Sequence, residues 1–568
     1  MKHSRWYVLP PAPDSYLANV QGFPPLIAQL LYNRGLAEPS QIESFLVADG
    51  RLLGDPFLLP DMHQAVARVY QALLSGENIA IYGDFDADGI TATALLVQGL
   101  ARLGGKVTPY IPHRLTEGYG LKTAALEKLY HQGISLVISV DCGITAVNEV
   151  KRARRMGLDV IVTDHHTPLE SVPAATAIVD PKRADSVYPF SELTGAGVAL
   201  KLLQALLISI GKEKQLDDLF DLVALGTVAD VSPLLGENRY LVKQGLKLIN
   251  SAPRLGIKEM ITQAGLTTGN LDAESISWIL APRLNAAGRL AHAMTSYKLL
   301  MTDSPKEAQG LSIWLEQKNS ERQRLTTRVL GKAREQVLAQ GTSSLLIASH
   351  QEFPPGVNGL VANRLAEEFY RPTIVIKTGY EVSSGSCRSI PEFNIIQALN
   401  QCRRLLSHFG GHSQAAGFTL PTRHLPRLQK ELQQLATTQL EGVDLRPRLD
   451  IDAEANLSKI GGDTFQTMQK LAPFGRGNPV PTFLSRGVKT IDCRTMGANG
   501  EHLRLKVKQD SKTWDAVGFR FGNHMAEVAP TIDIVYNLEI DRWQGVETLR
   551  LNILDFAPTS ETELWSKT

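Results

Sequence analysis

Between residues 65 and 179 the sequence alternates between short apolar runs and amphipathic segments, and this alternation constrains the fold more than any other feature. The apolar runs predict strands at 78–83, 106–111, 136–140, 159–163 and 177–179. The amphipathic segments predict helices at 91–103, 122–131 and 146–156. Strands and helices that alternate in this way favour a doubly wound, mostly parallel sheet. We therefore expect an α/β domain in this part of the chain.

Acidic and histidine residues stand directly after three of the predicted strands. They are Asp84, Asp86 and Asp88 in GDFDADG, Asp141 in VDCG, and Asp164, His165 and His166 in TDHH. Because the carboxyl ends of parallel strands line one crevice, these side chains are expected to converge. Clustered carboxylates repel one another unless cations lie between them. Oxygen and imidazole ligands without thiolates suit Mn²⁺ or Mg²⁺, and two such ions bridged by a carboxylate hydrolyse phosphate esters.

The first of these motifs has two other interpretations. The string DFDADG also opens an EF-hand calcium loop, but the twelfth position of that loop must be Glu and here it is Leu95. The EF-hand also needs a preceding helix, whereas NIAIYG has the composition of a strand. An ordinary turn that leads into a helix remains open for each motif alone, since the helix dipole favours acidic residues there. Their occurrence after three strands favours the metal site.

The rest of the chain predicts further domains, as its 568 residues exceed what one core normally serves. A polar helical segment at 305–340 is expected to connect the first domain, at 51–304, to a second α/β domain at 341–445. After 446, short alternating strands separated by Gly, Asn and Asp predict a small β-barrel, for which the OB-fold is the natural candidate. Residues 1–50 are expected to form an N-terminal extension packed on the first domain.

Composition limits the location and the partners. The formal net charge is +1, from 59 basic and 58 acidic residues, so any phosphate binding must come from local clusters. The four cysteines are scattered and suit a reducing cytosol. The N-terminal MKHSRWYVLPPAP lacks the apolar core of a signal peptide, and the apolar segment 195–211 is too short to span a bilayer. We expect a cytoplasmic protein without a membrane anchor.

Several later segments combine basic side chains with glycine or hydroxyl groups, as anion-binding loops do. Arg283 and Arg289 are expected to flank a small-residue turn in RLNAAGR, while Ser386 and Arg388 lie close together in SCRS. The other two candidates are His412 in GGHSQAAG and Arg114 in YIPHRLTEGYG. Each segment alone is equally consistent with ordinary turns that carry surface arginines.

The ordered set GDFDADG, VDCG, TDHH, Ala229-Asp230, PRLNAAGR and GGHSQAAG resembles the DHH phosphoesterase superfamily. YIPHRLTEGYGL and the C-terminal β module are similar to its branch of bacterial single-strand-specific DNA exonucleases. The resemblance implies a DHH catalytic domain, a DHHA1-type domain and an OB-fold. It implies metal ligands at Asp84, Asp86, Asp141, His165 and Asp230, with Asp141 as the bridge between two Mn²⁺ or Mg²⁺ ions. For His166 it implies a place near the scissile phosphate or a role in supporting a ligand. It implies that Arg283, Ser386, Arg388 and His412 bind the phosphates of DNA and that Arg114 helps to engage the 5′ end, while Arg289 is a phosphate-binding candidate from its own segment.

One position departs from the family pattern, because Tyr82 stands where many relatives have a metal-binding His. The implied activity is hydrolysis of single-stranded DNA to nucleotides from the 5′ end, in DNA repair and recombination. Implied partners are a single-strand-binding protein and a recombination helicase, and we expect a monomer. Two alternatives are a DHH nanoRNase or nucleotide phosphatase, whose members are generally shorter and lack the barrel, and an inactive single-strand-binding scaffold. Four aromatic residues of the last domain are candidates for stacking on bases or for the core: Trp514, Phe519, Phe521 and Trp543.

Overall fold

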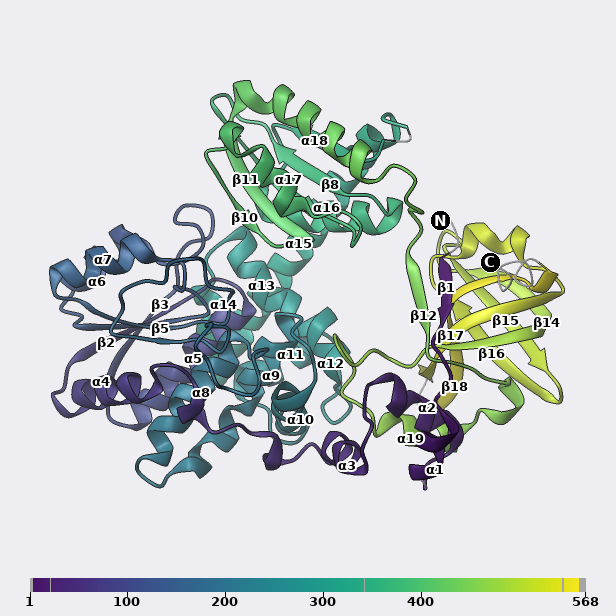
Figure 1. Cartoon of the computed structure of the whole chain (residues 1–568), viewed down its shortest axis with the longest axis horizontal. Helices are drawn as coiled ribbons and strands as arrows, with labels where there is room; N and C mark the ends of the chain where they lie inside the picture. Colours follow the sequence, from purple (N-terminus) through teal and green to yellow (C-terminus); the bar gives the residue numbers. More distant parts are fainter. Residues whose placement is uncertain (1–3, 21, 342, 544–545, 561–568) are drawn as a thin grey trace. The chain divides into compact units, whose positions relative to one another are not determined.

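The structure is a computed structural model that describes residues 4–20, 22–341, 343–543 and 546–560, without the side chains of 542–546. The chain divides into two compact units (Figure 1). The larger unit contains residues 48–443 and 475–477, and the barrel unit contains 1–47, 444–474 and 478–568. Among the described residues no helix is long and apolar enough to cross a membrane.

The first sheet of the larger unit has five parallel strands in the order β3-β2-β4-β5-β6. Their bounds are β2 Asn78–Gly83, β3 Lys106–Tyr110, β4 Leu136–Val140, β5 Asp159–Thr163 and β6 Ala177–Val179. The chain starts at β2, moves to β3 on one side, and then continues through β4 on the other side. The strand order therefore reverses between β2 and β4, and in open α/β sheets this is where ligands bind. The predicted doubly wound sheet is confirmed.

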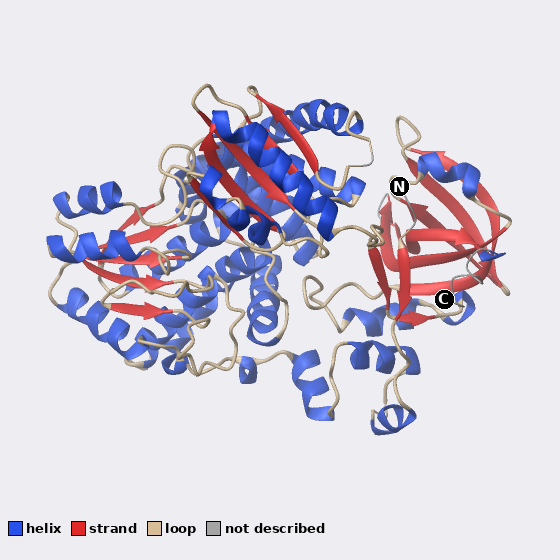
Figure 2. Cartoon of the chain, turned by 45° about the horizontal axis from the view of Figure 1, so that its top comes forward, coloured by secondary structure: helices blue, strands red, loops and turns tan. Residues whose placement is uncertain are grey.

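Both faces of this sheet are covered by helices, as Figure 2 shows. Ile79 and Ile81 of β2 face a core shared with α4 (Met62–Leu74), α5 (Ala87–Arg102) and α8 (Gly195–Ile208). The alternate residues Ala80 and Tyr82 face a second core formed with α6 (Thr123–His131) and α7 (Val147–Met156). A strand buried on both faces has no polar alternation, which is why NIAIYG reads as a continuous apolar run.

Further helices complete this part of the larger unit. They are α9 Phe220–Ala229, α10 Gly236–Ser251, α11 Leu255–Gln263, α12 Ala273–Ser275, α13 Ala281–Leu290 and α14 Met294–Met301. The expected small-residue turn at PRLNAAGR is wrong, because these residues form α13. Pro282 lies inside a continuous helical segment from Ala273 to Leu290, directly after a π-helical turn at Ile276–Leu280, which is the kind of irregularity that accompanies a proline inside a helix.

The long helix α15, Pro305–Leu338, leads to a second sheet in the order β10-β11-β9-β8-β7. The strands are β7 Leu346–His350, β8 Thr373–Lys377, β9 Val382–Arg388, β10 His408–Gly411 and β11 Ala415–Pro421. Three helices accompany them: α16 Pro355–Phe369, α17 Ile395–Gln401 and α18 Leu425–Gln439. Val329, Ala333 and Val337 of α15 pack into the same core as β7 and α16. The segment GGHSQAAG contains the turn of the β10–β11 hairpin, and β10 is an edge strand of this sheet.

In the barrel unit five strands close on themselves, because β14 pairs with both β15 and β17. The strands are β14 Phe483–Met496, β15 His502–Gln509, β16 Lys512–Gly518, β17 Thr531–Trp543 and β18 Val546–Pro558. Two short strands, β12 Arg448–Ile451 and β13 Ala453–Glu454, precede them, with helix α19 at Gly462–Gln469. The arrangement is that of an OB-fold, as expected.

The N-terminal segment belongs to the barrel unit, and its expected packing on the first domain is wrong. Strand β1, Arg5–Val8, pairs in parallel with β12, and the Trp6 indole N–H donates to Asp555 at 2.9 Å. Helices α1 Asp14–Asn19, α2 Pro25–Asn33 and α3 Pro39–Val47 follow. Asn33 of α2 donates to both the backbone and the carboxylate of Asp452.

Candidate metal centre and phosphate-binding cluster

Acidic and histidine side chains converge at the carboxyl ends of β2, β4 and β5, where the strand order reverses. Three groups have potential ligand atoms within 4.8 Å of one another: Asp84, Asp86 and Asp141; Asp141, His165 and His166; and Asp88, His165 and Asp230. Asp141 belongs to two of these groups, as a bridging carboxylate must. The structure thus brings all five sequence-predicted ligands to one place, together with His166 and Asp88.

Three carboxylates of this cluster, those of Asp84, Asp88 and Asp141, are buried, whereas Asp86 is half-buried and Asp230 is exposed. Asp84 and Asp141 are each 3% exposed, and Asp84 Oδ1 has no hydrogen-bond partner among the described residues. Burial, and then the charge of Asp86, raises the pKa of Asp84 well above its ordinary value. Burial and the four neighbouring acids raise the pKa of Asp141 in the same direction. A buried oxygen without a donor and mutually repelling carboxylates fit divalent cations held between them.

The two histidines of the TDHH motif differ in protonation. His165 Nε2 lies 3.0 Å from Asp141 Oδ1, and burial lowers the pKa of His165 to about 3, which leaves the neutral imidazole that metals bind. His166 Nδ1 contacts Asp164 Oδ1 at 2.8 Å. Although burial opposes protonation, this hydrogen bond and the surrounding acids raise the pKa of His166 to about 9. His165 therefore suits a ligand, while His166 is a cation at neutral pH.

Three further residues of the site have defined places. Asp86 caps α5, because its Oδ1 accepts the backbone N–H groups of Asp88 and Gly89. Asp230 ends α9, and burial raises its pKa to about 6 even though Ser232 donates to it. Tyr82, at the position where many relatives have a metal-binding His, donates its phenol O–H to the Gly120 carbonyl and stacks its ring on the Tyr110 ring. The group formed by Asp84, Asp86 and Asp141 therefore contains carboxylates and no imidazole.

A second cluster consists of arginines and adjoins the carboxylates within the larger unit. Burial, followed by the charges of Arg114, Arg322 and Arg388, lowers the pKa of Arg289 to about 9. The Arg289 guanidinium donates to the Gly356 carbonyl at 3.3 Å, in the first turn of α16. No carboxylate within 4 Å pairs with any of these four arginines among the described residues. Such a set of guanidinium groups matches a phosphate group.

The members of this arginine cluster come from distant segments. Arg114 follows β3, and its guanidinium lies 4.7 Å from the centre of the Phe85 ring. Arg388 ends β9, and Arg322 lies on α15, with its Nε buried and without a hydrogen-bond partner among the described residues. Sequence reasoning missed Arg322, because one arginine on a polar helix has no local signal. Arg114, Arg289 and Arg388 were sequence candidates.

The other three phosphate candidates are placed differently. Arg283 donates to Glu316 at 2.6 Å and to the Ile279 carbonyl, so its charge is already balanced. Ser386 lies two residues before Arg388 on β9. His412 lies in the β10–β11 turn, where partial burial, followed by the charges of His166 and Lys182, lowers its pKa. The second sheet thus brings His412 towards the metal centre.

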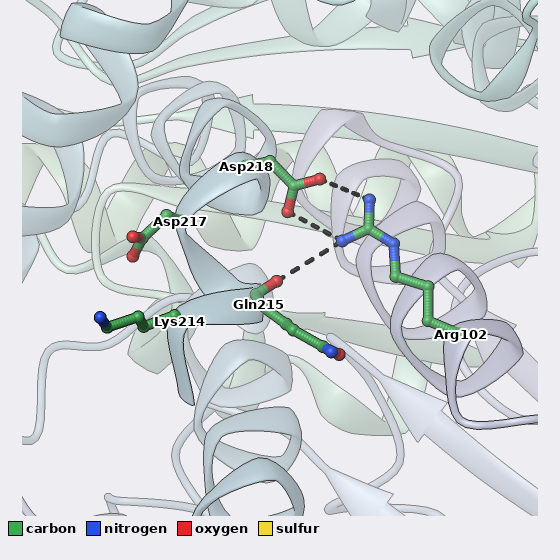
Figure 3. Close-up of a pocket in the computed structure, with 5 residues that line it drawn as sticks. All are labelled: Arg102, Lys214, Gln215, Asp217 and Asp218. Carbon is green, nitrogen blue, oxygen red and sulfur yellow. Dashed lines mark hydrogen bonds and ion pairs between the residues drawn. The ribbon is translucent and has the colours of Figure 1, made fainter. Parts of the chain in front are cut away.

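A surface hollow of about 540 Å³ lies elsewhere, lined by Arg102, Lys214, Gln215, Asp217 and Asp218. Figure 3 shows Arg102 bound to both the Asp218 carboxylate and the Gln215 carbonyl. Arg102 is at the opposite end of α5 from Asp88, roughly 20 Å away by helix rise. The hollow is therefore separate from the metal centre, and its arginine is neutralised.

Three family models match the chain: the DHH family N-terminal domain at 78–227, the DHHA1 domain at 342–438 and the RecJ OB domain at 451–555. The single-stranded-DNA-specific exonuclease RecJ of Bacillus subtilis (strain 168) is 38% identical over 568 residues, 99% of this chain and 72% of that protein. Its namesake in Escherichia coli (strain K12) is 32% identical, over 94% of this chain and 96% of that protein. The chain belongs to the RecJ family.

Solved RecJ structures agree with the fold. RecJ from Thermus thermophilus in complex with Mn²⁺ has a TM-score of 0.86 and 31% identity, covering 98% of this chain and 80% of that one. The Mg²⁺ complex of the same protein has a TM-score of 0.79 and 30% identity, covering 97% of this chain and 78% of that one. The expected DHH, DHHA1 and OB-fold domains are confirmed, as is the resemblance to single-strand-specific exonucleases.

Proposed function

We propose that this chain is a Mn²⁺- or Mg²⁺-dependent exonuclease that hydrolyses single-stranded DNA to nucleotides from the 5′ end. One observation carries this proposal: within one compact unit, a largely buried carboxylate and histidine cluster adjoins an arginine cluster that has no carboxylate within 4 Å among the described residues. The first cluster suits divalent metal ions and the second suits a phosphate group. Membership of the RecJ family supplies the substrate class.

In the proposed mechanism Asp84, Asp86, Asp141, His165 and Asp230 would hold two ions, and Asp141 would be the ligand that both share. Such ions, when bound, supply a hydroxide nucleophile at neutral pH and stabilise the attacking and leaving oxygens of an in-line displacement. The residues of the chain do the positioning.

Four side chains then act on the phosphates themselves. The cationic imidazole of His166, held by Asp164, donates a hydrogen bond to the scissile phosphate. Arg114, Arg289 and Arg388 hold the 5′ phosphate and so fix which bond reaches the ions.

The barrel unit supports capture of a strand. On β15 the side chains of Arg504, Lys506 and Lys508 all point outwards, at a spacing of about 7 Å between neighbours. Lys489 and Arg494 lie opposite them on β14, so five basic groups share this outer face. Two acidic residues, Asp492 and Asp515, lie on the same face, so basic groups outnumber acidic groups there. A basic track of this kind follows the phosphates of an extended strand.

One aromatic side chain accompanies this basic face. Phe519 is 44% exposed, and its ring meets the His502 ring at 5.4 Å. Trp514 is 6% exposed, and Phe521 packs on Phe556, so both belong to the core. The side chain of Trp543 lies outside the described residues. We assign base stacking to Phe519, since aromatic stacking tolerates any sequence.

The cellular context follows the family. We propose that the chain acts as a monomer in the cytoplasm during DNA repair and recombination. A single-strand-binding protein and a recombination helicase would supply its substrate, because the enzyme needs unpaired ends.

The decisive experiment digests single-stranded and duplex DNA labelled at either end, with Mn²⁺, Mg²⁺ or EDTA. We expect loss of the 5′ label first, from single strands only, and no reaction in EDTA. Early release of the 3′ label would overturn the polarity. Cleavage of dinucleotides but not of long strands would favour a nanoRNase, and strand binding without hydrolysis would indicate an inactive scaffold.

A further inference from the structure

Asp141 has a backbone conformation that needs support from its surroundings. Its φ is +61°, in the left-handed region that residues other than glycine rarely adopt. Such a conformation is strained and persists only where neighbouring structure enforces it. The conformation also sets the direction of the Asp141 carboxylate, which lies close to Asp84 and Asp86 and also to His165.

The first residue of α8 lies directly against Asp141. A Cβ atom on Gly195 would stand 2.4 Å from the Cβ of Asp141 and 2.8 Å from its Cγ, far inside van der Waals contact. Only a glycine lets the helix approach so closely. The backbone at the start of α8 therefore forms one wall of the space in which the Asp141 side chain is held.

Asp88 fixes the start of α8 in that place. The Gly195 N–H donates to Asp88 Oδ2 at 2.6 Å, and the Ala196 N–H donates to Oδ1 at 2.9 Å. Asp88 is 1% exposed and lies in the first turn of α5. Hydrogen bonds from two orphan amides to one carboxylate are strong, and the helix dipole adds to them. Both oxygens of Asp88 are thus engaged by the helix.

We propose that Asp88 is a positioning residue, which clamps the start of α8 so that Gly195 holds Asp141 in its left-handed conformation. The inference rests on the proposed metal-dependent function, in which Asp141 bridges the ions. Asp88 lies within 4.8 Å of His165 and Asp230 in the third group of possible ligands, so its carboxylate could instead be read as a ligand. The two amide hydrogen bonds assign it to the helix.

The test measures Mn²⁺ binding to the full-length chain by isothermal titration calorimetry in Asp88→Asn and Gly195→Ala. Both substitutions should weaken Mn²⁺ binding about 10-fold or more with the stoichiometry unchanged, as supporting residues around metal sites do. The kcat on single-stranded DNA should fall while KM and strand affinity in EDTA stay near wild type. The matched control is Gly197→Ala, two residues further along α8 and away from Asp141, which should bind Mn²⁺ as wild type does.

Two results would overturn the proposal. If Asp88→Asn loses one ion while Gly195→Ala binds Mn²⁺ normally, Asp88 is a ligand. If both variants bind Mn²⁺ with wild-type affinity, the clamp does not position Asp141. Should Asp88→Asn fail to fold, Asp88→Glu replaces it, since the longer side chain keeps the charge but shifts both oxygens away from the Gly195 and Ala196 amides; wild-type Mn²⁺ affinity in that variant would overturn the clamp. A wild-type chain that binds Mn²⁺ but leaves DNA intact would refute the proposed function and not the clamp.

Discussion

Replacing Arg289 should change stability and DNA binding in opposite directions. Burial and three neighbouring arginines lower the pKa of Arg289 from 12.5 to about 9. At about 1.4 kcal/mol for each pH unit, this displacement corresponds to roughly 5 kcal/mol of unfavourable free energy for the charged side chain. Arg289→Met removes that cost but also loses the hydrogen bond to Gly356, worth about 1 kcal/mol, and some packing. We expect a net gain of about 1–3 kcal/mol in the free energy of unfolding.

The same substitution should weaken strand binding, because one phosphate contact disappears. The slope of log Kobs against log salt concentration should decrease in magnitude by about 0.7 for a single strand. Urea unfolding with an unchanged m value measures the stability, and a salt series with a 5′-phosphorylated oligonucleotide in EDTA measures the binding. The matched control is Arg154→Met, an exposed arginine on α7, which should change stability by less than about 0.5 kcal/mol. A destabilised Arg289→Met variant with the wild-type salt slope would refute the reasoning.

Three other substitutions test separate parts of the structure. Asp141→Ala should abolish metal-dependent hydrolysis while strand affinity in EDTA persists; unchanged hydrolysis would contradict the two-metal assignment. Lys201→Met should lower the free energy of unfolding in urea by about 3–5 kcal/mol, because it leaves the buried carboxylate of Glu237 (1% exposed) without its cation. The double variant Lys201→Met/Glu237→Leu should recover most of that free energy. A double variant as unstable as the single one would show that the pair is not the cause. Phe519→Ala should weaken strand binding, measured by fluorescence anisotropy, by about 1–3 kcal/mol and should leave the thermal midpoint of unfolding unchanged. An affinity equal to that of the wild type would exclude stacking at Phe519.

The sequence predicts an element well where burial makes its pattern uniform. Strands β2, β4 and β5 lie between glycine or polar turns and are buried on both faces, so 78–83, 136–140 and 159–163 are identified to the residue. Helix α13 is missed, because Pro282, Gly288 and a run of small residues imitate a turn, whereas tertiary packing makes them helical. The partner of β1 is also hidden, since β12 lies some 440 residues away and no local signal specifies such a pairing.

The residues of the site also differ in how far the sequence predicts them. Ligands that follow strands are predictable, because the topology of a parallel sheet forces strand ends together. Arg322 and the clamp formed by Asp88 are not predictable, since each acquires its role from a segment distant in sequence. Asp88 stands in a motif that suggests metal binding, yet its hydrogen bonds go to α8. Sequence therefore predicts the cluster, and geometry separates ligand from support.

The two clusters of the larger unit should make metal and phosphate binding cooperative. Each cluster is electrostatically unfavourable alone, with raised carboxylate pKa values on one side and a lowered arginine pKa on the other. Arg114 joins them, because burial lowers its pKa while the charges of Asp84 and Asp86 oppose that shift and favour its charged form. When Mn²⁺ fills the acidic side, Arg114 loses that stabilisation and becomes more available to a phosphate. A deoxynucleoside 5′-monophosphate and Mn²⁺ together should raise the thermal midpoint by more than the sum of their separate shifts. Strictly additive shifts would mean that the two clusters act independently.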